Sequence, residues 1–273
     1  MFDCDGVIYR NATTISGVPE TLAALRAAGK RCIFVTNSAV TSRASLAAKL
    51  ATLGIQGVTA ADCVTSASAA ASYLARNHPD VRRAYVVGGA GLFDELQLVG
   101  IQSIGDADVG GLKALVESGL RDAPDAVVVG MLAEGLCYAR LAKAAAYARD
   151  RTRPFIGTNP DASFPAGVSE LLPAGGCVVR FVAYGAEREP DCIVGKPNRD
   201  LALLVAQLYS LTPETTMMVG DRCNTDVAFG HSVGWQTMLV LSGCHGLGDA
   251  RSAGHHERPD YMADSVAYLA KCI

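Results

Sequence analysis

Charged and aromatic side chains are scarce in this sequence of 273 residues, and long apolar runs are lacking. Only 19% of the residues are charged and the formal net charge is −3, which excludes the basic stripe typical of nucleic-acid-binding proteins. The apolar runs stop well short of the ~18 residues that a membrane-spanning helix needs. Half of the residues are hydrophobic, which excludes intrinsic disorder. We therefore expect a folded protein with neither a nucleic acid nor a membrane as its partner.

The nine cysteines include no CxxC pair, which excludes a zinc knuckle and a thioredoxin-like redox motif. Their odd number and the length of the chain also argue against a secreted disulfide framework. We expect reduced and mostly buried thiols, as in a cytoplasmic protein.

Short β-branched runs alternate along the chain with longer amphipathic stretches rich in alanine and leucine. This alternation is typical of an α/β protein with a mainly parallel sheet. The length corresponds to about 1.8 domains of ~150 residues each, so we expect two domains. Strands are expected at residues 32–35, 84–87, 126–129, 155–156, 192–194, 217–219 and 238–241, helices from near Pro19, from near Ser42, at 66–77 and at 200–209, and loops at 161–173 and 242–259.

Small or chemically active residues follow four of the expected strands. In open α/β sheets, ligands bind beyond the carboxyl ends of the strands, so these residues are candidates for one shared site. They are Asp3-Cys4-Asp5-Gly6, Thr36-Asn37-Ser38, Gly195-Lys196-Pro197 and the run at 220–226.

The residue types at these strand ends suit the transfer of a phosphoryl group. Asp3 and Asp5 lie two residues apart, so an extended chain points both to one side, one as nucleophile and the other as general acid and base. Attack of a carboxylate on an anionic phosphate needs positive charge, which Lys196 and a divalent metal can supply. Asp221 and Asp3 offer the oxygen ligands that suit Mg²⁺. Neutral donors for the phosphate oxygens are Thr36 and Asn37.

These motifs and their order resemble the haloacid dehalogenase superfamily of phosphatases, which use an aspartate nucleophile. The more specific resemblance is to the branch that includes 4-nitrophenylphosphatase, phosphoglycolate phosphatase, pyridoxal phosphatase and NagD. The matching segments are FDCDGV at 2–7, TNS at 36–38, TNPD at 158–161, GKP at 195–197, GDRCNTD at 220–226 and LVLSG at 239–243. The resemblance spans nearly the whole chain, and it implies Mg²⁺-dependent hydrolysis of small-molecule phosphomonoesters through an aspartyl-phosphate.

The resemblance also implies a role for each matching residue. Asp3 is the nucleophile and a metal ligand, and Asp5 is the acid and base and binds the metal through its backbone carbonyl. Asp221 is a further metal ligand, and Asp226 is a second acidic position outside the direct ligands. The residues implied to bind phosphate are Thr36, Asn37 and Lys196.

An inserted cap domain is a further implication of the resemblance. We expect a doubly wound Rossmann-like core at 1–79 and 173–273, carrying a smaller α/β cap at 80–172. An expected helix ends before Pro79, a new βα pattern follows, and prolines and glycines at 173–176 mark the return to the core. The branch also suggests a homodimer. The cap residues expected to face the substrate are Thr158, Asn159 and Asp161.

Other functions fit parts of the same pattern. A phosphotransferase or a mutase passes through the same aspartyl-phosphate, and a non-catalytic metabolite-binding protein can use the same fold. The segment Gly88-Gly89-Ala90-Gly91 would also be compatible with a nicotinamide-binding oxidoreductase. It does not meet the GxGxxG spacing, however, and it favours a structural turn that enters a helix.

Two positions depart from the pattern of the resemblance. Only Met1 and Phe2 precede Asp3, too few for a central strand, so we expect the natural protein to carry further residues before Met1. Cys223-Asn224 stands where many relatives carry Leu-Asp or Leu-Arg, which predicts the loss of one contact near the metal site.

Overall fold

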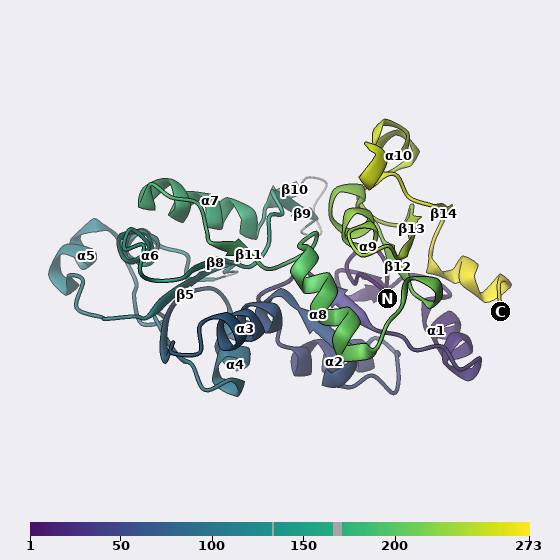
Figure 1. Ribbon diagram of the computed structural model, residues 1–273, viewed down its shortest axis with the longest axis horizontal. Coiled ribbons are helices and arrows are strands. Elements are labelled where there is room, and N and C mark those ends of the chain that lie inside the picture. Colours follow the sequence, from purple (N-terminus) through teal and green to yellow (C-terminus); the bar gives the residue numbers. More distant parts are fainter. Residues whose placement is uncertain (133, 166–170) are drawn as a thin grey trace.

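The computed structural model describes residues 1–132, 134–165 and 171–273 (Figure 1). Two parallel sheets lie side by side, each covered by helices, and both ends of the chain lie in the lobe drawn on the right of Figure 1. The other lobe carries the elements from β5 to β11. Within these described ranges, no helix is both long and apolar enough to cross a membrane.

The first sheet is parallel throughout, and the residue before Asp3 lies at its centre. Phe2 bridges the strands on both sides: its N–H donates to the carbonyl of Ile33 at 2.8 Å, and the N–H of Asp3 donates to the carbonyl of Val219 at 2.9 Å. Asp3 therefore emerges at the carboxyl edge of the sheet, between two neighbouring strands. The strands, in order across the sheet, are β4 (Cys63–Thr65), β3 (Phe34–Thr36), residue 2, β12 (Met217–Gly220), β13 (Gln236–Val240) and β14 (Tyr261–Ala263).

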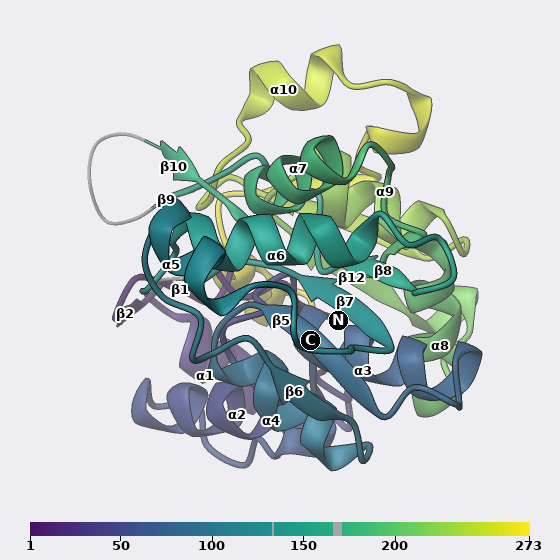
Figure 2. The ribbon, with the colours of Figure 1, turned by 90° about the vertical axis from the view of Figure 1, so that its left-hand side faces the viewer.

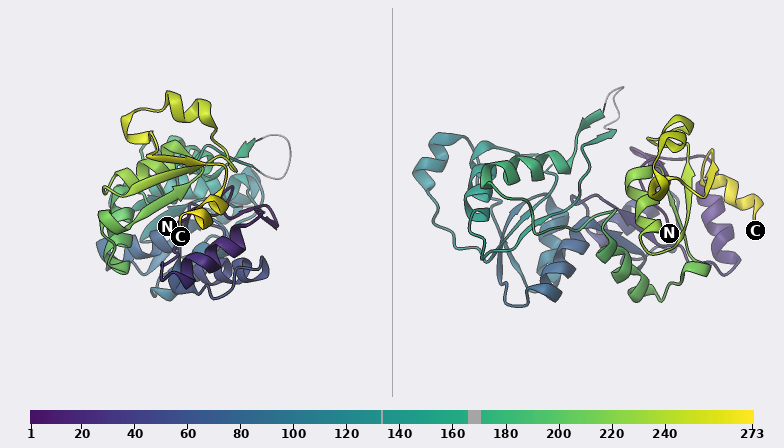
Figure 3. Two further views of the ribbon diagram at one scale, coloured as in Figure 1. Left: turned by 90° about the vertical axis from the view of Figure 1, so that its right-hand side faces the viewer. Right: turned by 45° about the horizontal axis from the view of Figure 1, so that its top comes forward.

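Helices cover both faces of this sheet, because alternate strand residues point to opposite sides. Phe34 and Val219 pack into one apolar cluster, with Leu22 of α1 (Val18–Ala27) and Leu46 of α2 (Arg43–Thr52). Val35 packs into the other cluster, together with apolar side chains of three further helices. The result is a doubly wound α/β core (Figure 3). The helices of the second face are α3 (Ser66–Asn77), α8 (Arg199–Tyr209) and α9 (Ala228–His231).

The second sheet is also parallel and is also covered on both faces. Val86 and Val128 face α3 and α4 (Ala90–Leu98), whereas Val127 and Val129 face α6 (Tyr138–Ala148) and α7 (Gly175–Ala186). Figure 2 shows α6 and α7 above this sheet and α3 and α4 below it. Helix α5 (Leu112–Ser118) packs on α6. The strand order is β11 (Cys192–Ile193), β8 (Phe155–Gly157), β7 (Ala126–Val129), β5 (Arg83–Val87) and β6 (Gln102–Ile104).

The core segment predicted at 173–273 includes α7 and β11, but β11 is a strand of the second sheet and α7 covers that sheet. Strand β11 pairs with β8, and α7 packs against α6. The prolines and glycines at 173–176 therefore mark only the start of α7, and not the return of the chain to the core. We propose that the inserted cap runs from residue 80 through Ile193 and that the chain re-enters the core at Gly195.

The two expected loops also contain short elements. Residues 161–173 include β9 (Ser163–Pro165) and β10 (Leu171–Pro173), which pair as antiparallel strands, and residues 166–170 between them lie outside the described part of the chain. Residues 242–259 include α10 (Leu247–Ser252), where the Asp249 carboxylate accepts the N–H of Gly246 at 2.8 Å. Elements this short show no periodicity in the sequence. The remaining short elements are the strands β1 (Tyr9–Arg10) and β2 (Thr13–Thr14) and the short 3-10 or π helices η1 (Ala60–Asp62), η2 (Pro213–Thr215), η3 (Cys223–Val227), η4 (His255–Glu257) and η5 (Val266–Lys271).

The glycine-rich turn at 88–91 leads into α4 and packs against the core. The N–H of Gly91 donates to the carbonyl of Val40 at 3.1 Å, and a Cβ at Gly91 would crowd the backbone of Thr41. This close approach explains the glycine by packing alone.

Candidate active site

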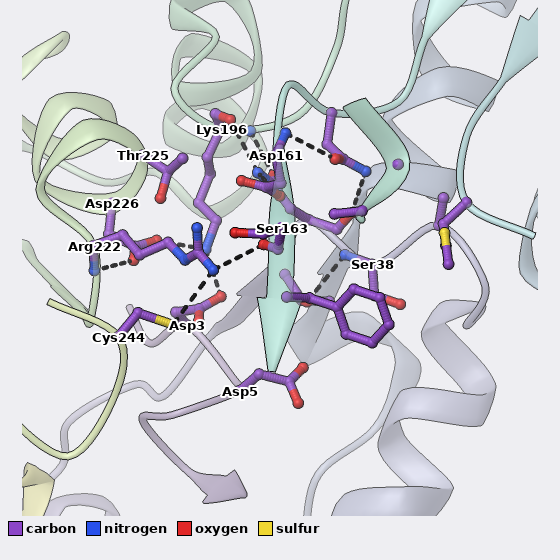
Figure 4. Close-up of a pocket in the computed structure, with 18 of the residues that line it drawn as sticks. Asp3, Asp5, Ser38, Asp161, Ser163, Lys196, Arg222, Thr225, Asp226 and Cys244 are labelled. Carbon is purple, nitrogen blue, oxygen red and sulfur yellow. Dashed lines mark hydrogen bonds and ion pairs between the residues drawn. The ribbon is translucent and has the colours of Figure 1, made fainter. Parts of the chain in front are cut away.

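The residues expected at the strand ends line one cavity between the two sheets (Figure 4). Its volume is about 240 Å³, which suits a small molecule. The core supplies one wall, and the cap segment around Asp161 and Ser163 supplies the other. Residues brought to this cavity from separate strand ends are Asp3, Asp5, Thr36, Asn37, Lys196, Asp221 and Asp226.

Lys196 lies at the base of the cavity, with its ammonium surrounded by acceptors. Its side chain is 2% exposed, and Nζ lies 2.5 Å from Oδ1 of Asp3 and 2.6 Å from Oδ1 of Asp226. Nζ also donates to the carbonyl of Val35 at 2.8 Å. Burial alone would lower the pKa of this lysine, but the charges of Asp226 and Asp3 outweigh burial and raise the pKa above its usual value. The two carboxylates therefore favour the charged form of Lys196.

Three carboxylates converge beside this ammonium. Asp3, Asp221 and Asp226 each offer an oxygen, and the three oxygens lie within 4.8 Å of one another. Burial, reinforced by the charge of Asp226, raises the pKa of Asp221 to about 6. Burial also raises the pKa of Asp3, although Lys196 opposes this effect. One ammonium does not neutralise three carboxylates, so the cluster suits a hard divalent cation such as Mg²⁺.

Asp226 differs from the other two because both of its oxygens are used within the protein. Oδ2 accepts the N–H groups of Asp221 and Arg222, each at 3.1 Å, and Oδ1 pairs with Lys196. A Cβ at Gly220 would overlap the Asp226 side chain, so only glycine lets this carboxylate lie against β12. These contacts orient the backbone of Asp221 and Arg222, and the expected position of Asp226 outside the direct metal ligands stays a prediction.

Asp5 lies at the mouth of the cavity, away from the other carboxylates. The hydroxyl of Tyr9 donates to Oδ2 of Asp5 at 3.4 Å. The side chain of Asp5 is exposed, yet partial desolvation by the surrounding residues raises its pKa, and the nearby Lys49 partly opposes this shift. A raised pKa favours a carboxyl group that can carry a proton and give it up.

Asn37 lines the cavity as expected, but its side-chain amide is already hydrogen-bonded within the protein. Its two N–H hydrogens go to Oδ2 of Asp161 and to the carbonyl of Lys196, both at 3.0 Å, and its oxygen accepts the N–H of Lys196 at 2.7 Å. This side chain therefore fixes the lysine turn and the cap, which leaves the backbone N–H as the group of Asn37 suited to phosphate. Thr36 accepts the N–H of Ser38 at 3.1 Å through Oγ1, so its own hydroxyl hydrogen can be donated to a ligand.

The three expected cap residues take three different positions. Asp161 lines the cavity, and burial raises the pKa of its carboxyl, an effect that the Asn37 hydrogen bond opposes. Asn159 also lines it, but its amide donates to the carbonyl of Asn37 at 3.0 Å. Thr158 is fully buried behind Asn159 and accepts a hydrogen bond from it at 3.2 Å.

Arg222 is a cavity residue that the sequence analysis left without a role. Its Nη2 donates to the carbonyl of Ser163 in the cap at 3.0 Å and lies 3.3 Å from Sγ of Cys244 (Figure 4). Arg222 thus joins the core to the cap across the cavity. The position of Arg222 inside the 220–226 motif could have indicated that it lies in the cavity. Its partners Ser163 and Cys244 belong to no motif, so the sequence does not indicate their positions.

The departure at Cys223-Asn224 leaves the cavity lining intact. The Cys223 side chain is buried with Leu239 and Ala250, and Asn224 is exposed. The backbone N–H of Cys223 donates to Nδ1 of His245 at 3.0 Å, a contact that sequence patterns do not reveal.

A doubly wound core that gathers buried carboxylates at the ends of its parallel strands, beside a buried lysine from the turn after β11, defines a class of α/β proteins that bind a cation and an anion together. Comparison with known sequences identifies the member of this class. The family model described as haloacid dehalogenase-like hydrolase matches residues 1–102, and a second model, of HAD-hydrolase-like proteins, matches residues 193–269. The chain belongs to the haloacid dehalogenase-like hydrolase family.

Individual relatives match over the whole chain. Phosphoglycolate phosphatase 2 of Arabidopsis thaliana is 36% identical, with 100% of this chain and 92% of the relative covered. Glycerol-3-phosphate phosphatase of Homo sapiens is also 36% identical, with 100% and 90% covered. The crystal structure of a glycerol phosphate phosphatase from Mycobacterium tuberculosis in complex with magnesium superposes with a TM-score of 0.84 at 28% identity, covering 99% of this chain and 76% of that one.

Proposed function

We propose that the protein is a Mg²⁺-dependent phosphatase that hydrolyses small-molecule phosphomonoesters through an aspartyl-phosphate on Asp3. One observation carries the proposal: Asp3, Lys196 and Asp221 meet at the base of a cavity of about 240 Å³ that Asp5 borders. The named relatives are phosphatases of phosphoglycolate and of glycerol 3-phosphate, which supports a small leaving alcohol.

The first half of the reaction transfers the phosphoryl group to the protein. A carboxylate oxygen of Asp3 attacks phosphorus and forms an acyl-phosphate bond, while the bond from phosphorus to the substrate oxygen breaks. Asp5 gives its proton to the departing alkoxide, and the raised pKa of Asp5 favours the protonated form needed for this step. The products of this half are the free alcohol and a phosphorylated Asp3.

The second half returns the protein to its starting state. Asp5, now a carboxylate, takes a proton from water as the water oxygen attacks phosphorus. The bond between phosphorus and the Asp3 oxygen breaks, and inorganic phosphate leaves. Lys196 and the hydroxyl of Thr36 stabilise the negative charge on the phosphoryl oxygens in both halves.

Mg²⁺ would be held by the carboxylates of Asp3 and Asp221 and by the backbone carbonyl of Asp5, and it would neutralise charge on the phosphoryl group. The buried carboxylate cluster fits this cation, because the carboxylates of Asp3 and Asp221 are both destabilised by burial and by neighbouring negative charge.

Mg²⁺ is expected to raise the melting temperature, and to do so more at about pH 8 than at about pH 5. Without metal, the folded state holds a proton on Asp221 up to about pH 6 that the unfolded state has already lost, so stability falls as pH rises through this range. A cation at 100 times its Kd adds about 2.7 kcal/mol, or about 5–10 °C in Tm. Thermal scans in Mg²⁺ and in EDTA at both pH values test this. An equal shift at both would show that Asp221 does not titrate with metal binding.

A phosphate-release screen tests the proposed activity directly. The panel contains phosphoglycolate, glycerol 3-phosphate, pyridoxal phosphate, nucleoside monophosphates and 4-nitrophenyl phosphate, each with Mg²⁺ and with EDTA. Mg²⁺-dependent phosphate release from at least one monoester is expected, and zero release across the panel would contradict the proposal in favour of a binding protein. Added alcohols separate hydrolysis from transfer, because a phosphotransferase would form new phosphomonoesters from them.

The cytoplasm is the compartment we propose, because the nine cysteines are free thiols that a reducing environment preserves. The homodimer stays a prediction from the family resemblance, and sedimentation equilibrium of the purified chain tests it.

A further inference from the structure

The loop that follows β13, residues 242–246, wraps around the carboxylate of Asp221. The N–H of Cys244 donates to Oδ2 of Asp221 at 2.8 Å, and the N–H of His245 donates to the carbonyl of the same residue at 3.0 Å. The loop therefore holds both the side chain and the backbone of one of the proposed metal ligands.

The ring of His245 fixes the next turn of the chain as well. Its Nδ1 accepts the N–H of Cys223 at 3.0 Å, and Cys223 lies two residues after Asp221. Because Nδ1 accepts this hydrogen bond, the ring hydrogen lies on Nε2. His245 thus binds the chain on both sides of Arg222, once through its backbone and once through its ring.

The same loop also contacts the turn that carries the proposed nucleophile. The hydroxyl of Ser242 donates to the carbonyl of Gly6 at 2.7 Å. A Cβ at Gly243 would overlap the Asp221 carboxyl, and one at Gly6 would crowd it too. Gly6 also has a φ of +77°, which favours glycine. The position of the loop therefore sets the separation of Asp221 from the Asp3 turn.

The carboxylates of Asp3, Asp221 and Asp226 repel one another, so contacts such as those of the loop at 242–246 are needed to hold Asp221 in place. Partners that orient metal ligands from outside the coordination sphere commonly account for about 10–100-fold in metal affinity. We infer that His245 is a positioning residue of the Mg²⁺ site: by joining Cys223 to the loop at 242–246, it holds Asp221 in the place where it binds the cation. The inference rests on the proposed function, since it requires Mg²⁺ at this site.

The test compares two variants of His245 by titration calorimetry with Mg²⁺ at about pH 8, without substrate. His245→Ala removes the acceptor and is expected to weaken Mg²⁺ binding about 10–100-fold. His245→Asn places its Oδ1 where Nδ1 was and is expected to restore most of the affinity. His255→Ala, in the exposed η4 turn, is the matched control and is expected to bind Mg²⁺ like the unmodified protein.

The outcomes separate the inference from the function on which it rests. An unmodified protein that fails to bind Mg²⁺ would contradict the proposed function. Normal binding by His245→Ala, or an equal loss in His245→Ala and His245→Asn, would overturn the role of His245 and leave the function standing. Melting temperatures in EDTA show whether each variant is folded.

Discussion

The Asp3→Asn variant is expected to lose at least ~10³-fold in kcat while keeping its fold. Asparagine has nearly the same shape as aspartate, but its amide cannot form the acyl-phosphate bond on which the mechanism depends. Steady-state kinetics with the best substrate of the screen measure this loss. Asp94→Asn, on the exposed surface of α4, is the matched control and is expected to keep the unmodified kcat.

Stability separates this loss from unfolding. Burial raises the pKa of Asp3, and Asp226 and Asp221 add to this effect, so a neutral side chain at position 3 relieves repulsion. We therefore expect the melting temperature of Asp3→Asn in EDTA to equal or exceed that of the unmodified protein. Full phosphatase activity in this variant would refute the assignment of the nucleophile.

Lys196→Met is expected to lose both activity and stability. The ammonium is 2% exposed and pairs with Asp3 and Asp226, so its removal leaves two buried carboxylates without a counter-charge. Removal of one partner of a buried pair costs about 3–5 kcal/mol, which corresponds to roughly 10 °C in melting temperature for a chain of this size. The phosphoryl charge also loses its positive partner, and we expect kcat to fall by ~10³-fold or more. Thermal scans and steady-state kinetics measure the two effects.

A second substitution distinguishes charge from packing in this result. Adding Asp226→Asn to Lys196→Met removes one of the unpaired carboxylates, so part of the stability is expected to return while activity stays lost. Lys113→Met is the control, because the Lys113 side chain is 91% exposed. If Lys196→Met matched the unmodified protein in both melting temperature and kcat, the ion pairs at the base of the cavity would have no role in either.

The sequence predicts the regular elements well wherever they are long or apolar enough to show a period. Helix α3 and strand β7 begin and end where expected, at 66–77 and 126–129. A strand was expected at 192–194 and assigned to the core, because so short a run does not show which sheet it joins. Its pairing with β8 depends on a contact between segments that lie far apart along the chain.

Some of the site residues could likewise be predicted from the sequence, and others could not. Asp3 and Asp221 were predicted to meet because parallel strands end at one edge of a sheet, and they do lie in one cavity. Lys196 reaches the same cavity from the turn after β11, a strand of the second sheet. The role of Asn37 as a phosphate donor stays a prediction, and the contacts of its side-chain amide with Lys196 and Asp161 could not be predicted because these partners are distant in sequence. His245 could not be predicted for the same reason.

The central claim is that phosphate passes through a covalent bond to Asp3, and the Asp5→Asn variant tests it most directly. Nitrophenolate leaves without a proton, so this variant can complete the first half of the reaction but lacks the base for the second. Rapid mixing with 4-nitrophenyl phosphate and Mg²⁺, followed by acid quenching and peptide mass spectrometry, is the measurement. We predict a burst of one nitrophenolate per protein molecule and a phosphoryl group on Asp3. Steady release without a burst, or a phosphoryl group on another residue, would contradict the account.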